Sequence, residues 1–507
     1  MKLKSHYDIV IVGSGLGGLV SGVILAKEGY SVCILEKNQQ FGGNLQTFAR
    51  NKSIFDTGVH YIGGLSEGQN LYQYFKYLGI MDELNLHPLD ENAFDVVTFD
   101  TDNKEYNYAQ GYPKFIESLI KDFPEEEEAI QTFCDKIQKT CDKFPLYRLK
   151  KGRPYSDGVF RLQAKAYIES LTNNKTLQAV LVGTNFLYAG DSRTPFYVHS
   201  LSVNSYIESA YRCINGGSQI TKLLIRRLKE FGGEAYKYQE VEKFNFKDDK
   251  IDAVICKNGN IIKGNTFISN IEPKLTLKMV GDNRFKKSYT NRVKGIESTI
   301  AAFSLYIVFK PNTFPYINKN YYHFTSPDHV WTSQNYTAKT WPESYMFSMG
   351  VKSNTENYAD NLTIMAYMNY NEVAPWKDSF NTVANKNERG QTYAEFKAEK
   401  AEILITALEK KFPNIRQCIL NTYTSSPLSY RDYIATNNGS MYGYVKDVDK
   451  PMHSFISPKT RIENLFFTGQ SINMHGILGV TISAVVTCSQ LLGQEYLLNK
   501  ILESNKS

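Results

Sequence analysis

The sequence predicts an α/β fold, with α+β character in its second part, that opens on a βαβ unit. Three observations lead to this prediction. An apolar run at residues 9–12 enters a glycine-rich turn, a helix-like stretch of small residues follows, and a second apolar run at 32–35 ends in Glu36. With 507 residues the chain is too long for one simple core, so we expect two closely joined domains.

The first turn carries Gly13, Gly15 and Gly18 in the pattern G-x-G-x-x-G. In this pattern the first glycine turns the chain off the strand, the second lets a pyrophosphate approach the backbone, and the third lets the helix pack closely. The helix N-terminus offers free N–H groups to phosphates. Glu36 stands where an acid binds ribose hydroxyls. The pattern predicts a Rossmann-type dinucleotide site that also includes Ser14, Gly17 and Lys37.

A glycine pair decides between nicotinamide and flavin. Gly42 and Gly43 follow six residues after Glu36 and precede Asn44 and Leu45. A plain nicotinamide domain does not need such a pair. It resembles the second glycine motif of the flavin amine oxidase and phytoene desaturase superfamily, in which the pair lets the backbone follow the diphosphate and ribityl of FAD. We therefore expect FAD.

The C-terminal part supports the same cofactor. An apolar run at 465–467 leads into Thr468, Gly469 and Gln470, and a glycine-spaced turn from Gly476 to Gly479 opens a small-residue helix from Val480 onward. In the superfamily this strand, turn and helix close over the flavin. The positive end of the helix can stabilise negative charge on a reduced flavin. Packing alone is the alternative explanation for this helix.

The middle of the chain predicts how the first domain is completed. A helix at 220–231 and strands at 239–246, 251–257 and 266–269 follow one another, and the last strand ends in Asn270. We expect Val241 and Asn270 to contact the cofactor. The FAD domain is then discontinuous, formed by 1–75, 210–275 and 455–507. The substrate domain is formed by 76–209 and 276–454, a mixture of sheet and helices.

Composition excludes several classes of function. A net charge of +6 is modest for this length and argues against a dedicated nucleic-acid binder. The seven cysteines are scattered with no C-x-x-C, so we expect no disulfide framework, dithiol centre or metal site. A reducing, cytoplasmic location fits this cysteine usage. The sequence contains no uninterrupted run of about 18 apolar residues, so we expect no membrane-spanning helix.

Residues 55–63 read Phe-Asp-Thr-Gly-Val-His-Tyr-Ile-Gly. With the glycine motifs and with segments 205–211, 426–428 and 438–443, they resemble the retinol saturase branch of the carotenoid desaturase and isomerase family, along nearly the whole chain. The resemblance implies a non-covalent FAD enzyme that acts on an extended, conjugated, hydrophobic polyene. It places Gly58, Val59 and His60 beside the flavin. Asn44, Leu45 and Gln46 stand where vertebrate saturases carry two cysteines and a histidine, which leaves the polyene open.

Three side chains are candidates for proton transfer. His60 and Tyr61 lie in the segment just described, and His475 lies in the C-terminal turn. Histidine can donate a proton near neutral pH. For His60 we keep flavin contact and a structural hydrogen bond as alternatives, and for His475 packing or a backbone bond.

Several functions stay open at this point. The sequence favours reduction or desaturation of a polyene. The alternatives are carotenoid cis–trans isomerisation, flavin amine oxidation and non-catalytic carriage of a lipid or prenyl group. No second G-x-G-x-x-G has strand context, so NAD(P)H, if it is the electron donor, visits the flavin transiently. Basic and aromatic residues alternate in segment 143–165, which suits either a peripheral membrane surface or a solvated loop.

Overall fold

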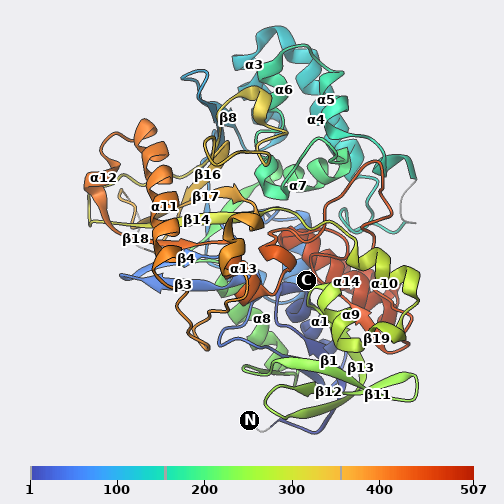
Figure 1. The fold of residues 1–507 in the computed structure, drawn as a ribbon. Coiled ribbons are helices and arrows are strands. Elements are labelled where there is room, and N and C mark those ends of the chain that lie inside the picture. Colours follow the sequence, from blue (N-terminus) through green and yellow to red (C-terminus); the bar gives the residue numbers. More distant parts are fainter. Residues whose placement is uncertain (1–2, 153–156, 354–356, 507) are drawn as a thin grey trace.

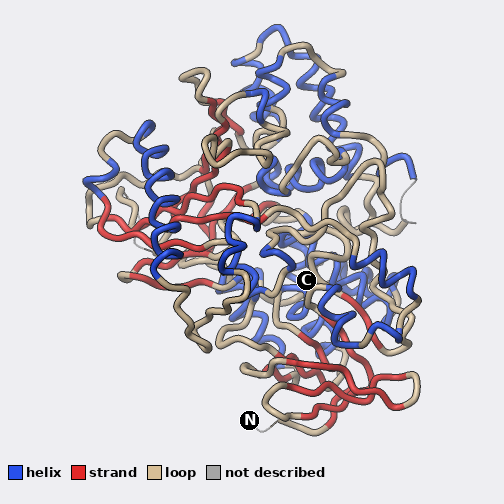
Figure 2. The backbone as a smooth tube through the Cα atoms, viewed as in Figure 1, coloured by secondary structure: helices blue, strands red, loops and turns tan. Residues whose placement is uncertain are grey.

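The computed structural model describes residues 3–152, 157–353 and 357–506, arranged around two large sheets (Figures 1 and 2). The first sheet has the order β10-β2-β1-β13-β12-β11, with β19 beside β13. Its strands are β1 His6–Val12, β2 Val32–Leu35, β10 Glu234–Tyr236, β11 Val241–Lys247, β12 Lys250–Cys256, β13 Ile261–Ser269 and β19 Leu465–Phe467. All of them fall within the ranges expected for the first domain.

The first sheet is covered on both faces. β2, β1, β13 and β19 run parallel. β2, β19 and the second half of β1 are apolar and buried, as are Phe267 and Ile268 near the end of β13, as expected for strands covered on both faces. Ile9 and Ile11 of β1 join one core with the helices α1 Leu16–Lys27, α8 Ser218–Glu230 and α14 Gly476–Leu492. Val10 and Val12 face the other way, into a core with α9 Pro273–Val280 and α10 Lys287–Lys294.

The second sheet is mixed and has the order β18-β14-β17-β16-β15-β7-β8. Its neighbouring strands are antiparallel except for the parallel pair β15 and β7. The strands are β7 Asp95–Phe99, β8 Tyr106–Tyr108, β14 Ala301–Phe309, β15 Asn320–Phe324, β16 Ser344–Met349, β17 Asn361–Met368 and β18 Ile419–Ser425. One face packs on α11 Gln391–Lys411, and the other faces the first sheet and the helices at the top of Figure 1.

Smaller elements join the two parts. The pairs are β3 Thr47–Arg50 with β4 Ser53–Asp56, and β9 Ala210–Cys213 with both β5 Ile62–Gly63 and β6 Leu86–Pro88. The remaining helices are α2 Asn70–Tyr77, α3 Tyr112–Asp122, α4 Glu127–Cys141, α5 Ala164–Glu169, α6 Lys175–Val180, α7 Phe196–Glu208, α12 Ile415–Cys418, α13 Pro427–Ile434 and α15 Gln494–Glu503.

The predicted fold class is confirmed, with differences at element boundaries. The helix expected from Val480 begins one turn earlier, at Gly476, a glycine with a positive φ of 74° that ends the preceding turn. The strand expected at 266–269 is the second half of the longer β13. The short edge strand β10 has no periodicity of its own and was not expected.

Segment 143–165 turns its aromatic side chains inward. Phe144, Tyr147 and Leu149 are buried in the first core, and Arg148 pairs with Glu208 at 3.0 Å. Arg153 and Tyr155 lie outside the described residues. In the described part, the apolar half of the pattern therefore serves packing, and contact with a membrane stays a prediction. None of the described helices is both long and apolar enough to cross a membrane.

The turn after β1 yields a test of this packing. A Cβ at Gly18 would lie 2.2 Å from the carbonyl oxygen of Gly13, so Gly18→Ala must push α1 away from the sheet. We expect a loss of about 1–3 kcal/mol in the free energy of unfolding, seen as a lower urea midpoint. Gly158→Ala, at an exposed glycine with open space around it, should leave the midpoint unchanged. Equal midpoints for all three proteins would contradict this account.

Candidate cofactor and substrate site

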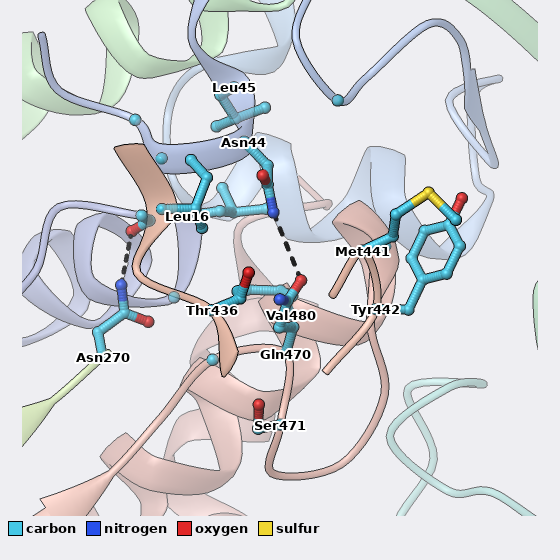
Figure 3. A pocket seen from close by; sticks show the side chains of 18 of the residues that line it. Leu16, Asn44, Leu45, Asn270, Thr436, Met441, Tyr442, Gln470, Ser471 and Val480 are labelled. Atoms are coloured by element: carbon cyan, nitrogen blue, oxygen red, sulfur yellow. Dashed lines mark hydrogen bonds between the residues drawn. The ribbon is translucent and has the colours of Figure 1, made fainter. Parts of the chain in front are cut away.

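A cavity with an empty volume of about 1080 Å³, part of it open to solvent, lies between the two sheets. It lies at the carboxyl ends of the parallel strands of the first sheet, which is where α/β folds bind their ligands. Figure 3 shows the turn before α1, the Asn44 segment, Gln470 and the start of α14 gathered around it. Of the predicted residues, its lining includes Gly15, Gly17, Gly42, Gly43, Asn44, Leu45, Gly58, Val59, Asn270, Gly469, Gln470, Gly476 and Val480.

Three glycine turns meet at the N-terminus of α1. Gly13 leaves β1 with a φ of 94°, and Gly15 is the N-cap residue of α1. A Cβ at Gly17 would lie 3.0 Å from the backbone of Gly469, and one at Gly43 would lie 3.2 Å from Cα of Gly15. Side chains are therefore excluded, and the first N–H groups of α1 are presented at the cavity with the positive end of the helix dipole. Gly18 and Gly479 pack behind this surface and do not line it.

Asn270 joins the ends of two strands to this turn. Its Nδ2 lies 3.2 Å from the carbonyl oxygens of both Gly13 and Gly15 and donates to them. The bond to Gly15 is the dashed line at the left of Figure 3. On the other side of the cavity, Asn44 Nδ2 donates to Gln470 Oε1 at 3.5 Å. The N- and C-terminal motifs are thus linked directly across the cavity.

Glu36 supports the turn from behind. It is buried, and its Oε2 accepts hydrogen bonds from the Ser14 backbone N–H at 3.2 Å and from Ser14 Oγ at 2.5 Å. Lys37 faces elsewhere, since its Nζ donates to the carbonyl oxygen of Asp432 at 2.7 Å. Neither Gly13, Ser14, Glu36 nor Lys37 lines the cavity. Val241 also lies away from it, buried in the core behind the first sheet.

His60 faces a second cavity rather than the first. This cavity has an empty volume of about 440 Å³ and is lined by Asp56, His60, Arg212, Ser348, Asn361, Thr363 and neighbouring residues. The Nε2 of His60 is buried and has no hydrogen-bond partner in the described part of the chain. Burial and the nearby charge of Arg212 lower the pKa of His60 to about 4. Its imidazole is therefore neutral at physiological pH.

Tyr61 is buried against the second sheet. Its hydroxyl donates to Asp95 Oδ2 at 2.7 Å and lies 2.6 Å from the hydroxyl of Tyr322. Burial raises the pKa of Tyr61 well above its usual range. Tyr61 is therefore a neutral phenol in a polar network and does not line the first cavity.

His475 stands behind the cavity wall. It is the N-cap residue of α14, its Nε2 donates to the carbonyl oxygen of Leu187 at 3.1 Å, and its ring lies 4.6 Å from that of Tyr442. Burial lowers the pKa of His475 to about 4. Tyr442 itself lines the cavity, so His475 contacts the cavity only through this phenol.

The wall of the first cavity formed by the second sheet and its connections was not predicted. These lining residues are Met365, Tyr430, Ile434, Thr436, Met441 and Tyr442, together with Leu16, Ile271, Glu272, Thr468, Ser471 and Ile477 near the glycine turns. Met365 reads as an ordinary strand residue, and nothing in its local sequence marks it. Met441 and Tyr442 do lie in segment 438–443, one of the stretches that carried the family resemblance.

The geometry defines a dinucleotide-binding α/β fold with an apolar and aromatic chamber beside the nucleotide turns. In the described residues, no group of three or more His, Cys, Asp or Glu side chains could hold a metal ion. The described cysteines are all unpaired thiols.

Comparison with known proteins agrees with this class. A family model described as an NAD(P)-binding Rossmann-like domain matches residues 11–78. The cyclohexylamine oxidase of Brevibacterium oxydans IH-35A superposes with a TM-score of 0.61 at 11% identity, over 98% of this chain and 99% of that one. At this identity the likeness shows a shared fold.

The expected family resemblance is also confirmed. The chain is 25% identical to all-trans-retinol 13,14-reductase of Danio rerio, over 97% of this chain and 86% of the relative. It is 25% identical to prolycopene isomerase 1 of an Oncidium hybrid cultivar, over 95% of this chain and 83% of the relative. Both similarities extend through the two sheets and the cavity between them.

The neutral His475 predicts how stability depends on pH. Its pKa in the folded protein, about 4, lies below the ordinary 6.5, so between these values the unfolded chain binds a proton that the folded chain excludes. This contribution is fully present above about pH 6.5 and is lost, at about 1.4 kcal/mol per pH unit, as the pH falls toward 4. We expect His475→Gln to lose less melting temperature than the wild type between about pH 7 and pH 5.

His453, an exposed histidine, provides the control for this measurement. His453→Gln should show the same acid-induced drop as the wild type. If His475→Gln also shows that full drop, the buried imidazole is not the group that titrates.

Proposed function

We propose that this protein is an FAD-dependent oxidoreductase that acts on carbon–carbon double bonds of a conjugated polyene, most directly as a reductase (saturase) or desaturase. The similarity to retinol reductases and prolycopene isomerases along the whole chain carries this proposal. Those relatives act on polyenes by name, and the cavity between the sheets offers an apolar chamber next to nucleotide-binding turns.

The residues around the cavity fit FAD. A Cβ at Gly17 or Gly43 would strike neighbouring backbone, which is the property of a cradle that a diphosphate approaches closely. The N-terminus of α1 would hold that diphosphate, and the buried carboxylate of Glu36 would hold the turn on the ribose side. Gly469, Gln470 and Gly476, at the start of α14, would lie along the ring system. When bound there, FAD supplies hydride exchange with carbon.

The remaining wall suits a long apolar substrate. Met365, Met441 and Ile477 provide apolar contacts, and Tyr430 and Tyr442 provide aromatic ones. Such a wall orients a planar chain of double bonds, excludes water and gains from aromatic packing. A conjugated chain also delocalises the charge that develops when one double bond gains or loses a hydride.

Isomerisation is the second candidate, because prolycopene isomerase matches this chain at the same identity as the reductase does. Amine oxidation has only the fold in its favour. A non-catalytic carrier has no use for the glycine cradle. A nicotinamide nucleotide, if it is the electron donor, would visit the flavin transiently, since the sequence holds a single G-x-G-x-x-G with strand context.

The cofactor assignment is tested by filling the cradle. Gly15 has an ordinary φ of −60° and lines the cavity. A Cβ there would lie 3.0 Å from Asn270 Nδ2, so Gly15→Val requires a small shift of that amide and places extra atoms at the edge of the phosphate site. We expect wild-type protein to show a flavin absorbance spectrum and Gly15→Val to lose most of it, with far-ultraviolet circular dichroism unchanged. Gly158→Val should retain full flavin content. A colourless wild type after reconstitution with FAD would refute the assignment.

The reaction is tested with a substrate panel. The flavin is reduced anaerobically with dithionite, and carotenoids and retinoids are added one at a time. We expect reoxidation of the flavin together with a shortened polyene chromophore, which identifies a saturase. A changed cis–trans ratio without net reoxidation would identify an isomerase. A flavin inert to each polyene in both redox states, yet reactive with amines, would overturn the polyene assignment.

A further inference from the structure

The second cavity lies directly beside the first, on the same face of the second sheet. On β17, Thr363 lines the second cavity and Met365 lines the first. Residues two apart on a strand share a face and lie roughly 7 Å apart. In the loop packed over this face, Val59 lines the first cavity and His60 lines the second. A single step along the backbone therefore separates the two cavities.

The buried guanidinium of Arg212, at the second cavity, lies near two buried carboxyls, of which Asp56 lines this cavity and Asp95 does not. Arg212, only 2% exposed, donates to Asn320 Oδ1 at 2.9 Å, and Asn320 Nδ2 donates to Asp95 Oδ1 at 2.8 Å. Asp56 lines the cavity beside Arg212. One buried cation balances one carboxylate, and a second unbalanced buried charge is far more costly than a neutral acid. One of the two carboxyls therefore keeps a proton.

The pKa values of the two carboxyls agree with one shared proton. Burial raises the pKa of both Asp56 and Asp95 to about 7. Hydrogen bonds limit this rise, from the Gly217 N–H to Asp56 and from Asn320 and Tyr61 to Asp95, and the charge of Arg212 adds to their effect. The other titratable or charged side chains that face Asp95 are tyrosines, whose pKa burial raises above the usual range: Tyr61, Tyr108 on β8, Tyr206 on α7 and Tyr322 on β15. Near neutral pH the exchangeable proton of this cluster therefore belongs to its carboxyls.

Two phenols extend this cluster away from Asp95. Tyr61 bridges Asp95 Oδ2 and the Tyr322 hydroxyl, at 2.7 and 2.6 Å. With Asp95 ionised, Tyr322 donates to Tyr61 and Tyr61 donates to Asp95. With Asp95 protonated, the direction of both hydrogen bonds reverses: Asp95 donates to Tyr61, and Tyr61 donates to Tyr322, because a hydroxyl can both donate and accept. Reversal of two hydroxyls thus moves one proton from Asp95 to the far side of Tyr322.

The register of the second sheet places the Tyr322 end of this hydrogen-bonded series on the side of the first cavity. Tyr322 pairs with Met346, and Met346 pairs with Met365, so these three lie in one row across one face of the sheet. Met365 lines the first cavity. The ring of Tyr206 lies 4.5 Å from that of Tyr61, and Tyr206 is near enough to the cavity-lining Tyr442 to add to the rise that burial causes in the pKa of Tyr442. The phenols therefore lie between Asp95 and the proposed site of reaction.

We propose that Asp95, Tyr61 and Tyr322 form a proton relay that serves the first cavity. This inference rests on the proposed function in its reductive direction. Saturation of one double bond adds a hydride, drawn through the cofactor from an external two-electron reductant, and one proton. The O–H bond of Asp95 breaks, a C–H bond forms on the substrate, and the carboxylate regains its proton from solvent between turnovers.

The stored proton is tested without substrate. Infrared spectra of the flavin-loaded protein should show the C=O band of a protonated carboxyl at neutral pH, with a midpoint near 7 as the pH rises. Asp95→Asn should abolish it, because Arg212 then serves Asp56 alone. Tyr61→Phe should shift its frequency by removing the bond to Asp95. Asp252→Asn, a variant of an acid on β12 paired with Lys263, should change nothing. Absence of the band, or its survival in Asp95→Asn, overturns the relay.

Delivery of the proton is tested by single turnover with reduced enzyme. Tyr322→Phe should slow polyene reduction on the order of 100-fold, with flavin content and the rate of flavin reduction unchanged. The wild-type rate should fall as the pH rises above about 7, because a deprotonated Asp95 cannot donate, and Tyr322→Phe should lose this dependence. Tyr321→Phe is the matched control, since Tyr321 lies next along β15 and packs on Phe347 in the opposite core.

The outcomes separate the relay from the proposed function. An active wild type whose rate and pH profile are unaltered in Tyr322→Phe overturns the relay and leaves the function standing. A wild type inert to every polyene overturns the function and the reaction assigned to the relay, while the frequency shift of the infrared band in Tyr61→Phe still decides whether Asp95 holds the proton.

Discussion

The close approach of backbone segments around Asn270 is the constraint on which the cofactor end of the structure depends. Its Nδ2 ties the carbonyl oxygens of Gly13 and Gly15, while its Oδ1 occupies the space that a Cβ on Gly17 or Gly469 would need. The ends of β1, β13 and β19 and the starts of α1 and α14 can meet only because these positions lack side chains. One amide thereby brings sequence motifs more than 450 residues apart to one cavity.

A second constraint acts where the two sheets meet. The face of the second sheet that looks toward the first changes from polar to apolar along the strands: Asp95, Asn320 and Thr363 lie in one row, and Tyr322, Met346 and Met365 lie in the next. The polar row requires a buried counter-charge, which Arg212 provides from β9. The apolar row leaves a dry wall beside the nucleotide turns. The two cavities with contrasting chemistry thus result from strand register.

Positions that follow from local backbone conformation are predictable from the sequence, and positions that depend on tertiary packing are not. Gly13, Gly15 and Gly43 were identifiable because their roles follow from backbone conformation, which the sequence of a turn determines. His60, Tyr61 and His475 lie in the right segments, yet each turns away from the first cavity, because packing against the second sheet and α14 decides which way a side chain points. Met365 and Tyr430 carry no local signal, because a residue lines a cavity through its tertiary neighbours.

By itself the sequence determined the Rossmann-type first domain, its discontinuous strands, the glycine cradle and the family resemblance, because apolar runs, turn glycines and helix starts act over a few residues. The tertiary structure alone decided the apolar wall, the burial of Phe144 and Tyr147 and the placement of Asp56, Asp95 and Arg212 in one cluster. Burial and charge balance depend on which distant segments pack together, and a pKa follows from that packing rather than from neighbours in sequence.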